Sequence, residues 1–216
     1  MILYLLGAFV VLVVYSSWTA YHQFVIKPRQ LVSPLIERAN GFCRDYTVPA
    51  EANPALCRKV VFLGDSLCCG VGASSLEKTL SYQVAATLLP PVRVINCATV
   101  GARAKDLVSQ LAELRQPLGP DDLVFVVVGG NDATHFTNPD SFRQAINETL
   151  KALDKKGCAK PVLVTVPDFW SVPALRRFGW IVDDRARYLN GRLRRIAFRL
   201  QLKIIDVYRE SKLTQA

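Results

Sequence analysis

Residues 60–67 read VVFLGDSL, a run of four apolar residues followed by a glycine, an acid, a serine and a leucine. The apolar run has the length of a strand and does not alternate with polar residues. Such a run indicates a strand that is covered on both faces, as in the parallel sheets of α/β proteins. Chemistry in these sheets lies beyond the carboxyl ends of the strands, so Gly64, Asp65 and Ser66 stand where a site is expected.

Similar apolar runs recur along the chain and are separated by longer stretches with helical spacing. This alternation predicts an α/β domain with right-handed crossovers and one parallel sheet. The expected strands are Val60–Leu63, Val92–Ile95, Leu123–Val128, Val162–Val166 and Ile204–Val207. Helices are expected between them near residues 77–89, 103–115, 140–155 and 184–201.

The next two expected strands also end in small or polar residues. The second strand is followed by NCATVG at residues 96–101, and the third by GGND at residues 129–132. Because the carboxyl ends of parallel strands meet at one edge of the sheet, these loops are expected to converge on one crevice. Three such segments in order, each after an expected strand, are a stronger signal than any one of them.

These segments resemble the sequence blocks of the SGNH, or GDSL-type, hydrolase family, and the resemblance covers roughly Lys59 to the C-terminus. It implies an α/β, flavodoxin-like three-layer sandwich whose parallel five-stranded sheet has the order 2-1-3-4-5. It also implies an enzyme that hydrolyses ester bonds, with Ser66 as the nucleophile. The oxyanion hole implied by the resemblance consists of the Ser66 backbone N–H, the Gly101 N–H and the Asn131 side chain.

The chemistry of ester cleavage suits these residue types. A serine hydroxyl is a weak nucleophile until a base removes its proton. The tetrahedral intermediate places negative charge on the former carbonyl oxygen, where one preorganised donor contributes about 3 kcal/mol. A glycine at position 101 lets a backbone N–H approach closely, and the Asn131 amide donates without carrying a charge.

Two other interpretations of the same segments stay open. Residues 64–66 also fit a strand-to-helix turn with a serine N-cap, and GGND alone also fits a turn. A phosphate-binding loop is another use of glycine-rich segments in such a sheet, but the first loop has neither G-x-G-x-x-G nor a Walker pattern. The cysteines do not form a zinc-type pair of C-x-x-C motifs, and no cofactor is expected.

The sequence departs from the family at the general base. Family members carry a late Asp-x-x-His block after the fifth strand, and this block is absent. The two histidines are His22, near the N-terminus, and His135, four residues after Asn131. His135 is therefore either a substitute base or only a residue of the rim. Asp206 has Arg209 in the place of the histidine, and because arginine cannot act as a base, we interpret Asp206 as structural.

Three explanations account for the missing block. The one that we favour is that the chain is a shortened form of a longer hydrolase. The second is a membrane-tethered binding module that keeps the fold without catalysing turnover, and the third is a different base. Removing the base of a serine hydrolase leaves residual acceleration from the oxyanion hole and from binding, but it costs several orders of magnitude.

The first 26 residues contain no Asp, Glu, Lys or Arg. About 20 helical residues span a bilayer core, so residues 1–26 predict a single-pass transmembrane anchor. The bulky Trp18, two residues before Ala20, makes a poor cleavage context for a signal peptide. Lys27 and Arg29 follow the span, and two charges are too few to assign the side of the membrane on which the domain lies.

After the anchor, the prolines and an Asn-Gly turn signal predict a linker over residues 27–58 with short helical pieces. The hydrolase-type domain is then expected over residues 59–216. This division gives one domain with an appendage, in keeping with a chain of 216 residues.

The chain carries a net charge of +9, and many of its arginines fall in the last expected helix, opposite the apolar stripe of that helix. A solvated helix face is favoured over a contact with anionic lipid, and without a nucleic-acid motif no nucleic-acid partner is expected. The family resemblance implies a small-molecule ester, such as a lipid or an acylated sugar. Phe169, Trp170 and Trp180 follow the fourth strand and fit an apolar substrate wall or core packing equally well.

Overall fold

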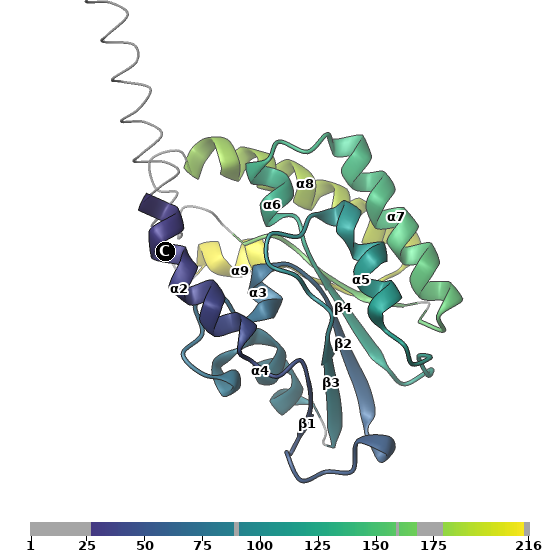
Figure 1. The fold of residues 1–216 in the computed structure, drawn as a ribbon. Coiled ribbons are helices and arrows are strands. Elements are labelled where there is room, and N and C mark those ends of the chain that lie inside the picture. Colours follow the sequence, from purple (N-terminus) through teal and green to yellow (C-terminus); the bar gives the residue numbers. More distant parts are fainter. Residues whose placement is uncertain (1–26, 89–90, 159, 168–178, 214–216) are drawn as a thin grey trace, which may run out of the picture.

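The computed structural model describes residues 27–88, 91–158, 160–167 and 179–213. In this part of the chain, helices cover both faces of a mostly parallel six-stranded sheet of order β1-β3-β2-β4-β5-β6 (Figure 1). The strands are β1 (Asp45–Val48), β2 (Arg58–Gly64), β3 (Val92–Asn96), β4 (Leu123–Val127), β5 (Val162–Val164) and β6 (Ile204–Ile205). The five expected strands are β2 to β6, and their expected order and parallel pairing are confirmed.

The expectation of five strands, all of them parallel, is wrong because β1 adds an antiparallel strand beside β3. Its register pairs Asp45 with Ile95 and Val48 with Val92. The strand comes from residues 27–58, where the sequence predicts a linker. Its sequence, DYTV, contains no apolar run that would mark it as a strand, and only one of its four residues is buried. Its ladder with β3 and a bidentate contact of Arg93 with Asp45, at 2.7 and 2.6 Å, hold it in place.

Strand β2 lies in the interior of the sheet, between β3 and β4. Val60, Val61, Phe62 and Leu63 are completely inaccessible to solvent, as the unbroken apolar run predicts. Burial of each such side chain contributes roughly 1.5–3 kcal/mol to stability. The stacked rings of Phe62 and Phe125, 5.1 Å apart, tie β2 to β4, so the strand before Ser66 is among the most firmly held parts of the fold.

Helices form a layer on each face of the sheet (Figure 1). One layer consists of α5 (Leu107–Glu113), α7 (Pro139–Lys155) and α8 (Gly179–Leu200). The other consists of α2 (Lys27–Asn40), α3 (Ser66–Cys69), α4 (Leu80–Thr87) and α9 (Val207–Leu213). The short helix α6 (Gly130–Thr134) follows β4 at the carboxyl edge of the sheet. The helices expected near residues 77–89 and 103–115 are each shorter than predicted and begin with a 3-10 turn, η3 (Leu76–Lys78) and η4 (Ala104–Asp106).

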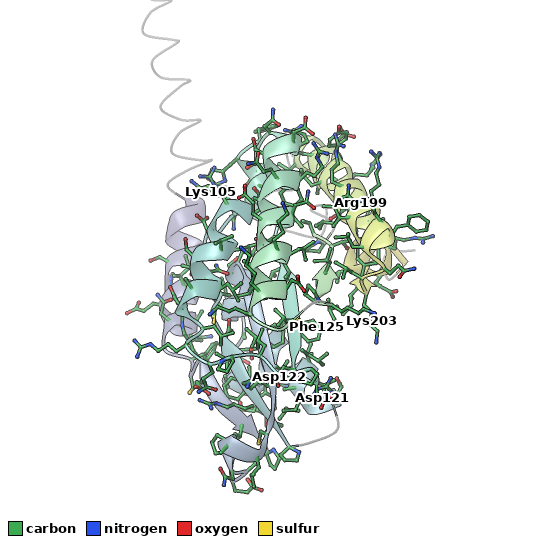
Figure 2. All side chains as sticks on the ribbon, turned by 90° about the vertical axis from the view of Figure 1, so that its right-hand side faces the viewer. Lys105, Asp121, Asp122, Phe125, Arg199 and Lys203 are labelled. Carbon is green, nitrogen blue, oxygen red and sulfur yellow. The ribbon has the colours of Figure 1, made fainter. Side chains whose placement is uncertain are left out.

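The carboxyl ends of the parallel strands, called here the carboxyl edge of the sheet, and their amino ends, the amino edge, lie toward opposite ends of the molecule. Lys105, in η4 at the carboxyl edge, and Asp122, just before β4, lie far apart along the long axis in Figure 2. At the amino edge, Asp122 accepts from the backbone N–H of Lys59 at 2.7 Å and forms an ion pair with its Nζ at 3.1 Å. Asp122 thus ties the start of β4 to the start of β2, and the loops expected to bear the chemistry lie at the other end of the strands.

Within the described part of the chain, no helix is both long and apolar enough to cross a membrane. The span expected over residues 1–26 lies outside the described residues. Phe169 and Trp170, expected to form an apolar wall, also lie outside them, as does the side chain of Trp180.

Candidate active site

Ser66 begins helix α3 directly after β2, at the carboxyl edge of the sheet. The preceding residue, Asp65, caps the helix, with an extended backbone and a carboxylate oxygen that accepts from the Leu67 N–H at 3.1 Å. Gly70, in the left-handed conformation with φ 82°, ends the helix after one turn. Ser66 is half-buried, and its backbone N–H belongs to the first turn of α3, where N–H groups have no partner within the helix.

The end of β2 is tied to the segments on both sides of it. The carbonyl of Gly64 accepts from the Thr99 N–H at 3.1 Å, and the Asp65 N–H donates to the Val127 carbonyl at 3.2 Å. A Cβ atom on Gly64 would lie 2.2 Å from that same Val127 oxygen. Only glycine therefore lets β2 and β4 stay paired two residues before Ser66.

Gly101 lies at the exposed tip of the loop that follows β3. Its φ of 80° is in the left-handed region, which glycine adopts without strain. The Ala102 N–H closes the turn on the Thr99 carbonyl at 3.1 Å. This is the same Thr99 whose N–H binds Gly64, so the loop of Gly101 is fastened to the strand that leads to Ser66.

Asn131 lies in the first turn of α6 and is half-buried. Its Nδ2 donates to the Ala102 carbonyl at 3.0 Å, which joins α6 to the residue after Gly101. An amide nitrogen carries two hydrogens, so one N–H remains for another acceptor. The structure thus connects the segments of Ser66, Gly101 and Asn131 at one edge of the sheet, as the sequence predicts, while the roles of these residues remain predictions.

A sequence profile of the GDSL-like lipase/acylhydrolase family matches residues 62–215, which include all three segments. The chain belongs to this family. By family it is therefore an ester hydrolase of the lipase and esterase type. The expected resemblance to the SGNH, or GDSL-type, hydrolases is confirmed.

Solved structures of GDSL hydrolases have the same fold. A member of the lipolytic G-D-S-L family from Veillonella parvula matches with a TM-score of 0.58 at 16% identity, over 70% of this chain and 79% of its own. An extracellular lipase from Streptomyces rimosus matches with 0.53 at 20% identity, over 70% and 81%. A lipase/acylhydrolase from Enterococcus faecalis matches with 0.52 at 23% identity, over 72% and 79%. No curated protein sequence matches the chain.

His135, the candidate base of this GDSL hydrolase, lies exposed immediately after α6. Its Nδ1 is 2.8 Å from the carbonyl oxygen of Asn131. A carbonyl only accepts, so this contact assigns the hydrogen to Nδ1 and leaves Nε2 with a free lone pair. The hydrogen bonds between described residues do not include one between the side chains of Ser66 and His135.

Asp206, which has the spacing of the family's acidic residue, forms a structural ion pair instead. It lies directly after β6 and contacts Arg194 of α8 at 2.8 and 2.9 Å. The hydrogen bond from Arg194 lowers the pKa of Asp206 below its usual value. The interpretation of Asp206 as structural is confirmed by this pairing of α8 with the start of α9.

Two buried carboxyl groups flank the expected nucleophile and the oxyanion segment. Burial raises the pKa of Asp65 to about 6, against the opposing effect of the Leu67 N–H and with a further increase from Asp132. Burial also raises the pKa of Asp132, whose Oδ2 accepts from the Ala104 N–H at 2.9 Å. Asp132 therefore joins α6 to the turn after Gly101 at an electrostatic cost, and both carboxyls favour the protonated form more than an exposed aspartate does.

Replacing Asp65 by asparagine is expected to stabilise the fold above pH 6. The folded state binds the Asp65 proton more tightly than the unfolded state, because its pKa rises from 3.8 to about 6. Stability therefore falls as the pH rises from about 4 to 6, by roughly 2–3 kcal/mol, and the loss persists at higher pH. Asparagine caps the helix equally well without this loss. Urea unfolding of Asp65→Asn and the unmodified chain should give equal stabilities near pH 4 and a gap at pH 7.5; a gap that does not change with pH would contradict this.

Two buried amide side chains at this edge were not expected from the sequence. Gln110 of α5 is 3% exposed and binds both backbone polar groups of Gly64, while Asn190 of α8 is fully buried and binds both of Val166. The signal available for Gln110 was its position on the apolar stripe of α5, beside the buried Leu107 and Leu111. A polar residue on such a stripe needs a partner in the core, but the sequence does not name that partner.

Proposed function

We propose that the chain cleaves esters by attack of the Ser66 hydroxyl on the ester carbonyl carbon. The observation that carries the proposal is the attachment of the Ser66, Gly101 and Asn131 segments to one another through Thr99, Gly64 and Ala102. A nucleophile at a helix start, with one donor on the adjoining loop of Gly101 and another in the first turn of α6, supplies the parts that acyl transfer needs.

The reaction would proceed through an acyl-enzyme. As the Ser66 oxygen bonds to the carbonyl carbon, its proton passes to a base and the carbonyl oxygen becomes an oxyanion. The oxyanion would accept from the N–H groups of Ser66 and Gly101 and from the second N–H of the Asn131 amide. Collapse of the intermediate expels the alcohol with a proton, and water then releases the acid and restores Ser66.

Among the described residues, His135 is the candidate for the base. Its Nδ1 is engaged by the Asn131 carbonyl at 2.8 Å, and this orients the ring and leaves Nε2 as the proton acceptor. The same carbonyl accepts from the His135 backbone N–H at 3.0 Å, so the turn that bears the ring is anchored to the proposed oxyanion residue. Apo structures often show long nucleophile–base separations that close only when substrate binds.

Apolar side chains near the proposed site favour an ester with an apolar part. Leu67, directly after Ser66, is 44% exposed, and Phe136, directly after His135, is 58% exposed. Arg185 of α8 supports the turn after Phe136 by donating to the Thr137 carbonyl at 2.8 Å. We therefore propose lipid or acylated-sugar esters as the substrate class, and residues 1–26, which carry no charged side chain, as a membrane anchor for the enzyme.

Replacing Asn131 by alanine should lower kcat for a short-chain p-nitrophenyl ester by roughly 10²- to 10³-fold, because one oxyanion donor is lost. KM should change little, since the donor acts on charge that develops only in the transition state. Asn147→Ala on α7 is the matched control, because it also removes a half-buried asparagine amide, one that accepts a hydrogen bond from Arg199 of α8 at 3.5 Å. Unchanged kcat in Asn131→Ala would refute the proposed oxyanion hole.

A further inference from the structure

The side chain of Gln110 makes a two-point contact with the backbone of Gly64. Its Oε1 accepts from the Gly64 N–H at 2.8 Å, and its Nε2 donates to the Gly64 carbonyl at 2.8 Å. Gln110 is 3% exposed, so water does not replace these bonds in the folded protein. The carboxamide thus gives Gly64 one acceptor and one donor, as the backbone of a neighbouring strand does within a sheet.

This contact falls where the ladder between β2 and β3 comes to an end. The last paired residues are Phe62 and Asn96, after which the chain of β3 leaves to form the loop of Gly101. The Cys97 N–H still donates to Phe62, at 2.9 Å, and the Thr99 N–H to Gly64, at 3.1 Å. The Gly64 N–H finds its acceptor in Gln110, so the glutamine continues the ladder that the departing loop interrupts.

The position of Gln110 links two parts of the proposed site. Gly64 is two residues before Ser66, and α5, which bears Gln110, begins directly after the η4 turn that follows Gly101. Gly64 also packs closely against β4 and α3, because an added Cβ would lie 2.2 Å from the Val127 oxygen and 3.2 Å from the Cys68 sulfur. On the side of the Gly101 loop, the Gly64 backbone is held by the Thr99 N–H and by the Gln110 amide, and only the amide binds the Gly64 N–H.

We propose that Gln110 is a positioning residue that sets the place of Ser66 relative to the Gly101 loop. The inference rests on the proposed function, in which Ser66 is the nucleophile. Loss of the amide leaves the Gly64 N–H buried without an acceptor, and the segment then relieves this by moving toward solvent. The reactivity of Ser66 falls by more than the loss of stability accounts for.

Asn190 provides the matched control because it makes the same kind of contact with Val166, after β5, and not with the segment that leads to Ser66. Its Oδ1 accepts from the Val166 N–H at 2.8 Å, and its Nδ2 donates to the Val166 carbonyl at 2.9 Å. Both amides are buried and bind a backbone N–H and carbonyl, and of the two only Gln110 binds the segment next to Ser66. A change specific to the Ser66 segment is therefore separable from the general cost of losing a buried amide.

The experiment compares Gln110→Met and Asn190→Leu in the full chain, with a fluorophosphonate probe that bonds to a reactive serine hydroxyl and expels fluoride. In Gln110→Met we expect the labelling rate to fall by at least about tenfold, as small misplacements of catalytic groups produce losses of up to about 10²-fold. Amide hydrogen exchange should become faster over residues 64–69. In Asn190→Leu the labelling rate should stay within about twofold of the unmodified chain, at a comparable loss of urea stability.

Equal slowing of labelling in both variants, or unchanged exchange over residues 64–69 in Gln110→Met, would overturn the inference. If Gln110→Met does not fold, Gln110→Asn, which keeps an amide but shortens its reach by one methylene, should show the same two changes to a smaller degree. Labelling that persists in Ser66→Ala would refute the proposed function instead. In that case the exchange measurement still decides whether Gln110 holds the segment.

Discussion

Replacing Ser66 by alanine is expected to reduce hydrolysis of short-chain p-nitrophenyl esters by at least about 10³-fold, because removal of a serine nucleophile leaves only binding and oxyanion stabilisation. The fold should persist, since Ser66 is only half-buried and the α3 cap is provided by Asp65. Steady-state hydrolysis and covalent fluorophosphonate labelling measure the loss. Circular dichroism should show an unchanged fold.

Ser109→Ala on α5 is the matched control, because it removes an exposed hydroxyl outside the carboxyl edge. Hydrolysis that continues in Ser66→Ala at the rate of this control would refute Ser66 as the nucleophile. The same assay on His135→Ala addresses the base: a loss comparable to that of Ser66→Ala assigns the role to His135, and full activity excludes it. A chain that binds esters but neither hydrolyses them nor reacts with the probe would support the non-catalytic binding module.

Replacing Gly64 by alanine is expected to destabilise the fold by at least about 4 kcal/mol, at the far end of single-substitution effects. The new Cβ would lie 2.2 Å from the oxygen and 3.0 Å from the carbon of the Val127 carbonyl. Backbone of an interior strand cannot rotate away as a side chain does, so β2 and β4 must separate and lose bonds such as that from Asp65 to Val127. Urea unfolding followed by circular dichroism measures the change.

Gly191→Ala serves as the reference for this substitution. Gly191 lies within α8, and an added Cβ meets no atom within 4 Å. Alanine in the interior of a helix is favoured over glycine by about 0.5–1 kcal/mol, so this variant should be slightly more stable than the unmodified chain. Equal effects of the two substitutions would show that the close approach to Val127 carries no energetic weight.

The strand order was predictable because β2 to β6 each contain an apolar run, and because the family resemblance supplies the order of such runs. Strand β1 was not predictable in the same way. Tyr46 and Val48 alternate with polar residues, but four residues of which only Thr47 is buried, at 9% exposure, are too short a pattern to indicate a strand. Its place depends on backbone pairing with β3 and on the contact between Arg93 and Asp45, which are 48 positions apart. A pattern of neighbouring residues does not show which distant residues will pair.

Some features of the candidate site were likewise predictable from the sequence, and others were not. Ser66, Gly101 and Asn131 follow strand ends, and the parallel topology brings strand ends together, so their proximity was predictable from their positions. Gln110 was not, because its contact with Gly64 spans 46 positions and joins a helix to a strand. The pKa of Asp65 was likewise unpredictable, since it is set mainly by burial under the packed fold. Sequence identifies side chains of the right chemistry, whereas their supports and their electrostatics depend on tertiary packing.

Strand β1 also has a consequence for self-association. Without it, β3 would present a row of unpaired backbone groups flanked by Val92 and Val94, which are both fully buried in this structure. An open, apolar strand of that kind recruits strands from other molecules and begins aggregation. The edge that β1 offers in its place is short, carries Asp45 and is followed by Pro49. We therefore expect this short antiparallel strand to prevent the sheet of one molecule from pairing with that of another.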